Sequence, residues 1–177
     1  MLLAQILLPL TFLVSHVLAD GASISAAIDN ISAAAAKLNE TVAGFPDNPI
    51  LGLTDIGDLL VDSTAALKSI KQGTKVAEAS GNLTVLEAFG LAGKISSLST
   101  TVQSTLDTTV AAKPRFDKLL IVSPIVLLNL KQQRSATVDF GDAVTEKIPV
   151  ELQPIAKNLQ APILAALDKA IAAYKTF

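Results

Sequence analysis

Hydrophobic residues recur at alternating steps of three and four along most of this chain. The first series runs Ile24, Ile28, Ile31, Ala35, Leu38, Val42 and Phe45. Such spacing places side chains on one face of an α-helix. Gly44, Pro46 and Pro49 follow the series, and they predict the end of a first helix.

Two further helices are predicted in the middle of the chain. One runs from about Thr54 to Ser80 and is followed by glycine, a residue common just after helix ends. The next begins at a capping box, in which the Thr84 hydroxyl accepts from the first turn and Glu87 reaches back to the backbone. Pro114 predicts its end at Lys113, because the residue before a proline avoids the helical conformation.

A fourth segment runs from Phe116 to about Ile148 and differs from the others. Nine of the twelve residues 119–130 are apolar, so this stretch is buried on most sides or lines a cavity. Within it, Pro124 predicts a kink or a new helix start with Ser123 as a possible N-cap. Residues 131–134 (Lys-Gln-Gln-Arg) are predicted to form a polar turn.

The last predicted helix covers residues 152–174, with a bend at Pro162. No segment of the sequence shows the strict alternation typical of a half-buried strand, and the many alanines favour helix. The sequence therefore predicts an all-α fold. We expect one single-domain antiparallel bundle of about five amphipathic helices, with neighbours joined by short turns.

Residues 1–19 have the features of a secretory signal peptide. Their apolar stretch is too short to span a bilayer, and cleavage is expected before Asp20. No Lys or Arg precedes the apolar stretch, which is atypical, and a buried N-terminal helix is the alternative. Removal of the signal would leave a secreted domain of residues 20–177, without a transmembrane segment or a hydrophobic anchoring tail.

The composition argues against enzymatic activity. The chain has no Cys, and its single His, His16, lies in the predicted signal, so the mature chain lacks the usual general base, nucleophilic thiol and zinc ligands. No Gly-x-Ser-x-Gly motif occurs, and only a Ser-Lys pair is left open. A net charge of −2 without a basic cluster argues against nucleic-acid binding.

Two acidic groups occur at helical spacing: Asp55, Asp58 and Asp62, and Asp139, Asp142 and Glu146. Metal sites in helical bundles use Glu-x-x-His pairs, and the mature chain has no His. We therefore interpret both groups as solvated helix faces and expect no metal and no cofactor.

Several stretches resemble the fungal hydrophobic surface-binding protein A family, which includes cell-wall galactomannoproteins. They are residues 38–45, 102–107, 112–118, 130–133 and 155–162, followed by 167–171. The resemblance implies a secreted helical bundle at the cell wall or outside the cell. It also implies adsorption to hydrophobic surfaces with recruitment of a secreted polyester hydrolase, or binding of fatty acids in a central cavity. The family offers no catalytic motif to transfer.

The apolar stretch 119–130 is the best candidate for contact with a ligand. Either other helices surround it, or one face meets a fatty acid, a sterol or another hydrophobic ligand. From the helical stripes we predict a pocket lined by Leu67, Ile95, Leu98, Val102, Ile125 and Leu128. A bundle that opens and lays its apolar stripes on a surface would bind without a cavity.

Three Asn-x-Ser/Thr sequences offer acceptors for N-glycosylation, at Asn30, Asn39 and Asn82. Asn82 lies in a predicted loop. Asn39 lies at the margin of the first apolar stripe, where a structural role is equally plausible.

The leading hypothesis for function is a secreted, non-catalytic protein that binds hydrophobic surfaces or lipids. The alternative is a structural cell-wall mannoprotein that acts as a glycan-bearing spacer. Helical inhibitors of plant-type wall enzymes share the architecture but depend on disulfides, and the absence of Cys counts against them.

Overall fold

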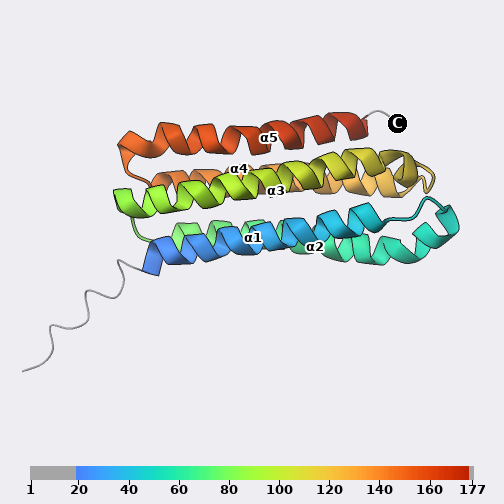
Figure 1. Cartoon of the computed structure of the whole chain (residues 1–177), viewed down its shortest axis with the longest axis horizontal. Coiled ribbons are helices and arrows are strands. Elements are labelled where there is room, and N and C mark those ends of the chain that lie inside the picture. Colours follow the sequence, from blue (N-terminus) through green and yellow to red (C-terminus); the bar gives the residue numbers. More distant parts are fainter. Residues whose placement is uncertain (1–18, 176–177) are drawn as a thin grey trace, which may run out of the picture.

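Five long helices run along the axis of an elongated bundle (Figure 1). The computed structural model describes residues 19–175. The helices are α1 (Ala19–Gly44), α2 (Pro49–Ala79), α3 (Val85–Asp117), α4 (Val122–Lys147) and α5 (Gln153–Lys175), and a short 3-10 helix, η1 (Val150–Leu152), precedes α5. No strand occurs within residues 19–175. The predicted all-α fold with five helices is confirmed.

The helices form a closed ring around the bundle axis. Going around it, α1 packs against α2, α2 against α4, α4 against α5, α5 against α3, and α3 against α1. Chain direction alternates from each helix to the next in sequence (Figure 1). Spatial neighbours such as α1 and α3 are therefore parallel, in addition to the expected antiparallel pairs α1–α2 and α4–α5. A ring of five helices leaves a central axis that no helix occupies.

Local signals fix two of the helix starts. The predicted capping box at α3 is present: the backbone N–H of Thr84 donates to Glu87 Oε2 at 2.8 Å, and that of Glu87 donates to Thr84 Oγ1 at 3.3 Å. Helix α2 begins at Pro49, several residues earlier than predicted. Asn48 caps it by accepting from Ile50 N at 2.9 Å, and proline suits the first helical position.

The predicted end of α3 at Lys113 is wrong, because the helix continues through Pro114 to Asp117. Long-range contacts hold the extra turn. The Phe116 ring is fully buried and meets Phe45 edge to face, with 4.8 Å between ring centroids. The Arg115 guanidinium donates to the carbonyl oxygen of Phe45 at 2.5 Å. These partners outweigh the backbone hydrogen bond lost at the proline.

The predicted polar turn at residues 131–134 is also wrong, because α4 is continuous there. Two of its four polar side chains have partners on α4 and α5. Gln133 is buried and donates to Asn129 Oδ1, while Arg134 forms an ion pair with Asp168 of α5. Ser123 is not the N-cap of α4, since it lies within the first turn and donates to Asp117 Oδ1 at 2.5 Å.

The core divides into two clusters along the axis. One surrounds Phe45, Phe116 and Tyr174 near the α1–α2 and α3–α4 turns. The other surrounds Ile28, Ala77 and other residues near the opposite end. The Tyr174 hydroxyl donates to the carbonyl oxygen of Thr109 at 2.7 Å, which fixes the end of α5 to α3.

The predicted signal peptide, apart from Ala19 at the start of α1, lies outside the described residues. Within residues 19–175, no helix is both long enough and apolar enough to cross a membrane.

Candidate functional site: a cavity inside the ring of helices

A cavity of about 110 Å³ runs inside the ring, and all five helices contribute to its wall. On the same measure a single water needs roughly 10–15 Å³, so the cavity holds several heavy atoms in a row. Aliphatic side chains dominate the lining. They include Ile28, Leu38, Val42, Ile56, Leu60, Ala66, Leu98, Val102, Leu106, Ile125, Val126, Ile163 and Leu167.

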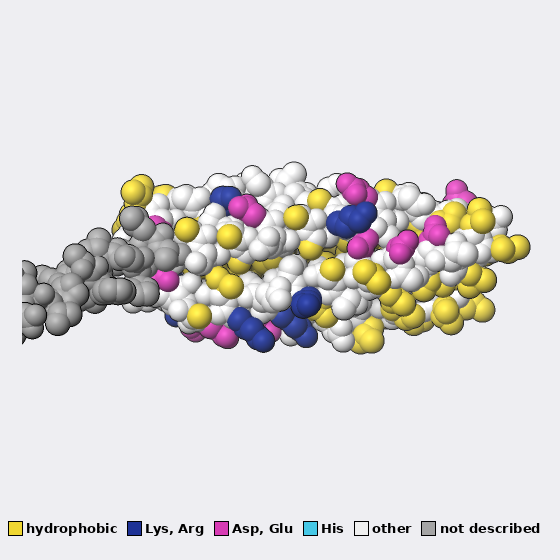
Figure 2. Space-filling view, turned by 90° about the horizontal axis from the view of Figure 1, so that it is seen from below, with side chains coloured by type: hydrophobic (Ala, Val, Ile, Leu, Met, Phe, Trp, Pro, Cys, Tyr) yellow, Lys and Arg dark blue, Asp and Glu magenta, His cyan; other side chains and the backbone are white. Residues whose placement is uncertain are grey.

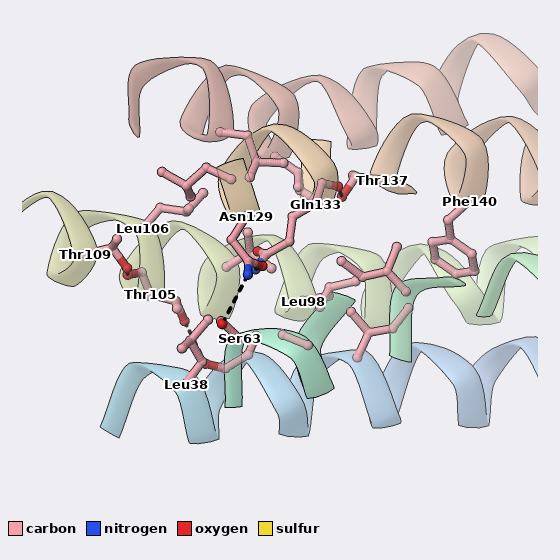
Figure 3. A pocket seen from close by; sticks show the side chains of 18 of the residues that line it. Leu38, Ser63, Leu98, Thr105, Leu106, Thr109, Asn129, Gln133, Thr137 and Phe140 are labelled. Carbon is pink, nitrogen blue, oxygen red and sulfur yellow. Dashed lines mark hydrogen bonds between the residues drawn. The ribbon is translucent and has the colours of Figure 1, made fainter. Parts of the chain in front are cut away.

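A band of uncharged polar groups crosses the apolar wall at mid-length (Figure 3). Asn129 of α4 donates to Ser63 Oγ of α2 at 3.3 Å, and Gln133 donates to Asn129 Oδ1 at 3.2 Å. Thr105 and Thr109 of α3 also line the cavity, and their hydroxyls donate to backbone carbonyls. These groups offer a ligand a few hydrogen bonds within an otherwise apolar space.

Helix α4 supplies more of the wall than any other helix. Val122, Ile125, Val126, Asn129 and Leu130 all lie in the segment that the sequence singled out, and all line the cavity. This segment is thus neither enclosed on all sides by other helices nor exposed as a free surface.

At the end of the cavity farther from the α3–α4 turn, Gly141 leaves space for the Gln160 side chain of α5. A Cβ at Gly141 would overlap the amide of Gln160. That amide donates to the carbonyl oxygen of Thr137 at 3.0 Å, and all three residues line the cavity. Glycine at position 141 thus lets α5 close this part of the wall against α4.

No ionisable side chain lines the cavity within the described residues. Tyr174 lies nearby in the core, and burial raises the pKa of its phenol, with the Asp117 carboxylate acting in the same direction. The phenol is therefore neutral at physiological pH. The site can hold an alkyl chain and hydrogen-bond a polar head, but it offers no cation to pair with an anionic one.

Four of the six residues predicted for the pocket line the cavity, namely Ile95, Leu98, Val102 and Ile125. The other two do not. Leu67 packs, partly buried, against the second core cluster. Leu128 is 57% exposed on the outer face of α4. Periodicity placed residues of α3 at the cavity wall, but it did not show which side of the apolar α4 segment faces inward.

The polar members of the site were not predicted. Ser63, Asn129 and Gln133 interrupt apolar stripes, and two of them lie on one face of α4 four residues apart. A polar pair at that spacing inside an apolar helix is a signal that could have identified them.

The three glycosylation candidates differ in exposure. Asn82 is exposed in the α2–α3 turn, and Asn30 is exposed on α1. Asn39 is half-buried, and its Oδ1 atom is buried without a hydrogen-bond partner in residues 19–175. This arrangement suits a glycan best at Asn82 and least at Asn39.

The acidic groups lie at helix surfaces. Asp58, Asp139 and Asp142 are exposed, while Asp62 accepts from the Thr41 hydroxyl at 2.5 Å. Within the part of the chain that the structure describes, no three His, Cys, Asp or Glu residues come together in a way that could hold a metal ion.

Comparison with known proteins identifies the family. The model of the family described as hydrophobic surface binding protein A matches residues 21–146, more than half of the chain. The protein belongs to this family. The match extends from the first turn of α1 nearly to the end of α4, and so includes most of the cavity wall.

Two relatives are each named cell wall mannoprotein 1. The protein from Aspergillus flavus is 28% identical over 160 residues, covering 81% of this chain and 58% of the relative. That from Aspergillus fumigatus is 26% identical over 148 residues, covering 84% of this chain and 50% of the relative. This family member thus spans about half the length of these two relatives.

Solved structures share the fold. Ligand binding domain 1 of the Penicillium marneffei MP1 protein, described as complexed with arachidonic acids, has a TM-score of 0.80 at 24% identity, covering 88% of this chain and 98% of that one. AFMP4P, described as in complex with palmitic acid, has a TM-score of 0.78 at 21% identity, covering 87% and 99%.

Proposed function

We propose that this protein binds single-chain lipids, fatty acids above all, in the cavity between its five helices. The observation that carries the proposal is the cavity itself: a narrow, aliphatic space with a band of uncharged polar groups. Burying an alkyl chain is worth about 0.8 kcal/mol per methylene, so a long chain supplies ample affinity.

The same features favour a flexible alkyl chain over a rigid sterol, because the cavity is small and bounded by all five helices. The family relationship supports the proposal. So do the two structural neighbours, which share the fold and are described as complexes with arachidonic and palmitic acids.

Titration of the delipidated protein with palmitic acid, followed by native mass spectrometry and thermal unfolding, tests the proposal. A bound ligand should raise the free energy of unfolding by about 2.7 kcal/mol at a hundredfold excess over the Kd. Cholesterol serves as the rigid comparison ligand and should bind more weakly.

A pair of matched variants locates the site. Val102 lines the cavity, whereas Val76 is also partly buried but lies outside its wall. Val102→Phe should fill the cavity and weaken palmitate binding about tenfold or more, and Val76→Phe should not. Leu128→Asp, at an exposed position, should leave binding unchanged. Equal affinities in folded Val102→Phe and the unsubstituted protein would exclude the cavity as the site.

We further propose a non-catalytic protein that acts outside the cell or at the cell wall. The cell-wall naming of the two relatives and the predicted signal peptide support this location. A secreted polyester hydrolase as partner stays a proposal from the family resemblance. If no lipid binds at any concentration, two candidates remain: adsorption to a hydrophobic surface without a cavity, and a glycan-bearing spacer with Asn82 as the most accessible acceptor.

A further inference from the structure

Exposed aliphatic side chains gather at the end of the bundle formed by the α1–α2 and α3–α4 turns. Figure 2 shows hydrophobic side chains concentrated at the right-hand end of the molecule. We call this surface the apolar tip and define it by Ile50, Leu51, Leu53, Leu120 and Ile121, each more than half exposed.

The two turns form one surface because they contact each other. The Lys118 ammonium donates to the carbonyl oxygen of Asp47 at 3.1 Å. Glycine at position 52 lets the Leu119 side chain lie against the start of α2, since a Cβ there would come within 3.1 Å of Leu119. The aliphatic residues of both turns are therefore held side by side.

Leu120 is held in an unfavourable backbone conformation. Its φ is 51°, a left-handed value that costs a leucine about 1–2 kcal/mol. Its side chain is 83% exposed, so core packing gives no reason for a leucine there. Glycine or asparagine would suit the backbone better. A strained, solvent-facing leucine at a turn therefore indicates a role for the side chain outside the folded chain.

The apolar tip is continuous with the cavity. On α2, Leu53, Ile56 and Leu60 follow at steps of three and four on one face, and the last two line the cavity. Ile121, the residue before α4, lies four positions ahead of the lining residue Ile125. The aliphatic surface thus extends from the exposed turns between α2 and α4 to the interior, without a charged residue on this path.

The charges at this end do not suit an anionic surface. Asp47, Asp55 and Asp58 lie beside the α2 part of the tip. The three cations of residues 113–118 have protein partners: Lys113 pairs with Asp117 at 2.7 Å, and Arg115 and Lys118 donate to backbone carbonyls. Binding to anionic lipid relies on available Lys and Arg side chains. An uncharged lipid surface fits this pattern better.

We propose that the apolar tip docks on an uncharged lipid surface, from which an acyl chain enters the cavity between α2 and α4. This inference rests on the proposed lipid-binding function, which it extends by naming the entrance and the surface that supplies the ligand.

The test measures flotation with phosphatidylcholine vesicles and the rate at which a fluorescent fatty acid passes from these vesicles to the protein. The variants are Leu120→Asn and Ile50→Asn/Leu120→Asn. The matched control is Leu86→Asn, because Leu86 is 81% exposed on the first turn of α3, at the opposite end. Asparagine tolerates the backbone of residue 120, so the variants should fold.

We expect the double variant to lose about tenfold or more in vesicle binding and in transfer rate. Leu86→Asn should leave both unchanged. The affinity of every variant for palmitic acid dissolved below its aggregation concentration should stay the same, because the cavity wall is intact.

Equal losses in Leu86→Asn and the tip variants, or no loss in the tip variants, would overturn the proposal. Tighter, salt-sensitive binding to phosphatidylglycerol vesicles would contradict the proposal that the docking surface is uncharged. If the protein binds dissolved palmitic acid but never floats with phosphatidylcholine, the docking inference fails and the proposed function stands. If it floats through the tip but binds no palmitic acid, the proposed function fails, and with it the role of the tip as an entrance.

Discussion

The two ends of the bundle terminate their helices in different ways. At the end with the α2–α3 turn, Thr84 and Glu87 cap α3, and the Leu83 N–H donates to the Lys147 carbonyl at 2.7 Å. At the apolar tip, α4 begins without a side-chain cap, and Leu120 has a left-handed backbone. The first end thus combines a capping box with a contact between distant segments. The tip has a side-chain cap at α2, where Asn48 accepts from Ile50 N, but none at α4, and it holds an exposed Leu120 in a strained backbone conformation.

The largest effect should come from the contact that holds the tip together. Phe116→Ala removes a fully buried ring that meets Phe45 edge to face, so we expect a loss of about 3–5 kcal/mol in the free energy of unfolding. Urea denaturation measures it. Phe89→Ala is the control at the opposite end, where the ring is mostly exposed, and should change stability by about 0.5 kcal/mol or less. A loss below about 1 kcal/mol for Phe116→Ala would mean that the tip folds independently of this contact.

At the end with the α2–α3 turn, which we call the capped end, the free energy of unfolding should fall when the Thr84 hydroxyl is removed. Thr84→Ala leaves the Glu87 N–H without its acceptor and should cost about 1 kcal/mol in urea denaturation. Ser97→Ala is the control, because the Ser97 hydroxyl only donates to a carbonyl within the same exposed helix face. Similar costs for both variants would show that the capping box contributes nothing particular to this end.

At the tip, a substitution should stabilise the fold. Leu120→Asn relieves the left-handed strain and should raise the free energy of unfolding by up to about 1 kcal/mol. Leu86→Asn, in the first turn of α3, should lower it slightly, since asparagine is a weaker helix former than leucine. A destabilised Leu120→Asn protein would show that leucine at this position serves the fold rather than a surface outside it.

This contrast also explains how much the sequence could predict. Helix starts and faces with strong local signals were located correctly: the Thr84–Glu87 capping box marks the start of α3, and repeated apolar steps mark α1. The predictions failed where distant partners decide: Phe45 and Arg115 carry α3 past Pro114, and partners on α4 and α5 keep residues 131–134 helical.

The site follows the same division. Periodicity assigned Ile95, Leu98 and Val102 to the cavity wall, because each lies on the clear stripe of α3. It could not orient α4, whose apolar residues occupy most of its circumference, and so Leu128 was placed inside although it faces solvent. The direction of an evenly apolar helix is set by its neighbours in the ring, which a stripe on one helix does not reveal.

The smallest expected effect is a dependence on pH at the capped end. Hydrogen bonds from the backbone and hydroxyl of Thr84 hold the pKa of Glu87 below its usual value. The charge of Glu87 therefore stabilises the fold above the unfolded pKa of about 4.3, and this contribution is lost as pH falls through the lower folded pKa. Glu87→Gln keeps a capping partner but removes the charge, so it should be less stable at pH 7 by less than about 1 kcal/mol. Urea titrations at pH 7 and pH 3 should show this gap narrow at the lower pH. The gap should also shrink in a Thr84→Ala background, where the hydroxyl donor is absent but the backbone donor remains. A gap that is unchanged at pH 3 would mean that Glu87 acts through its shape and not through its charge.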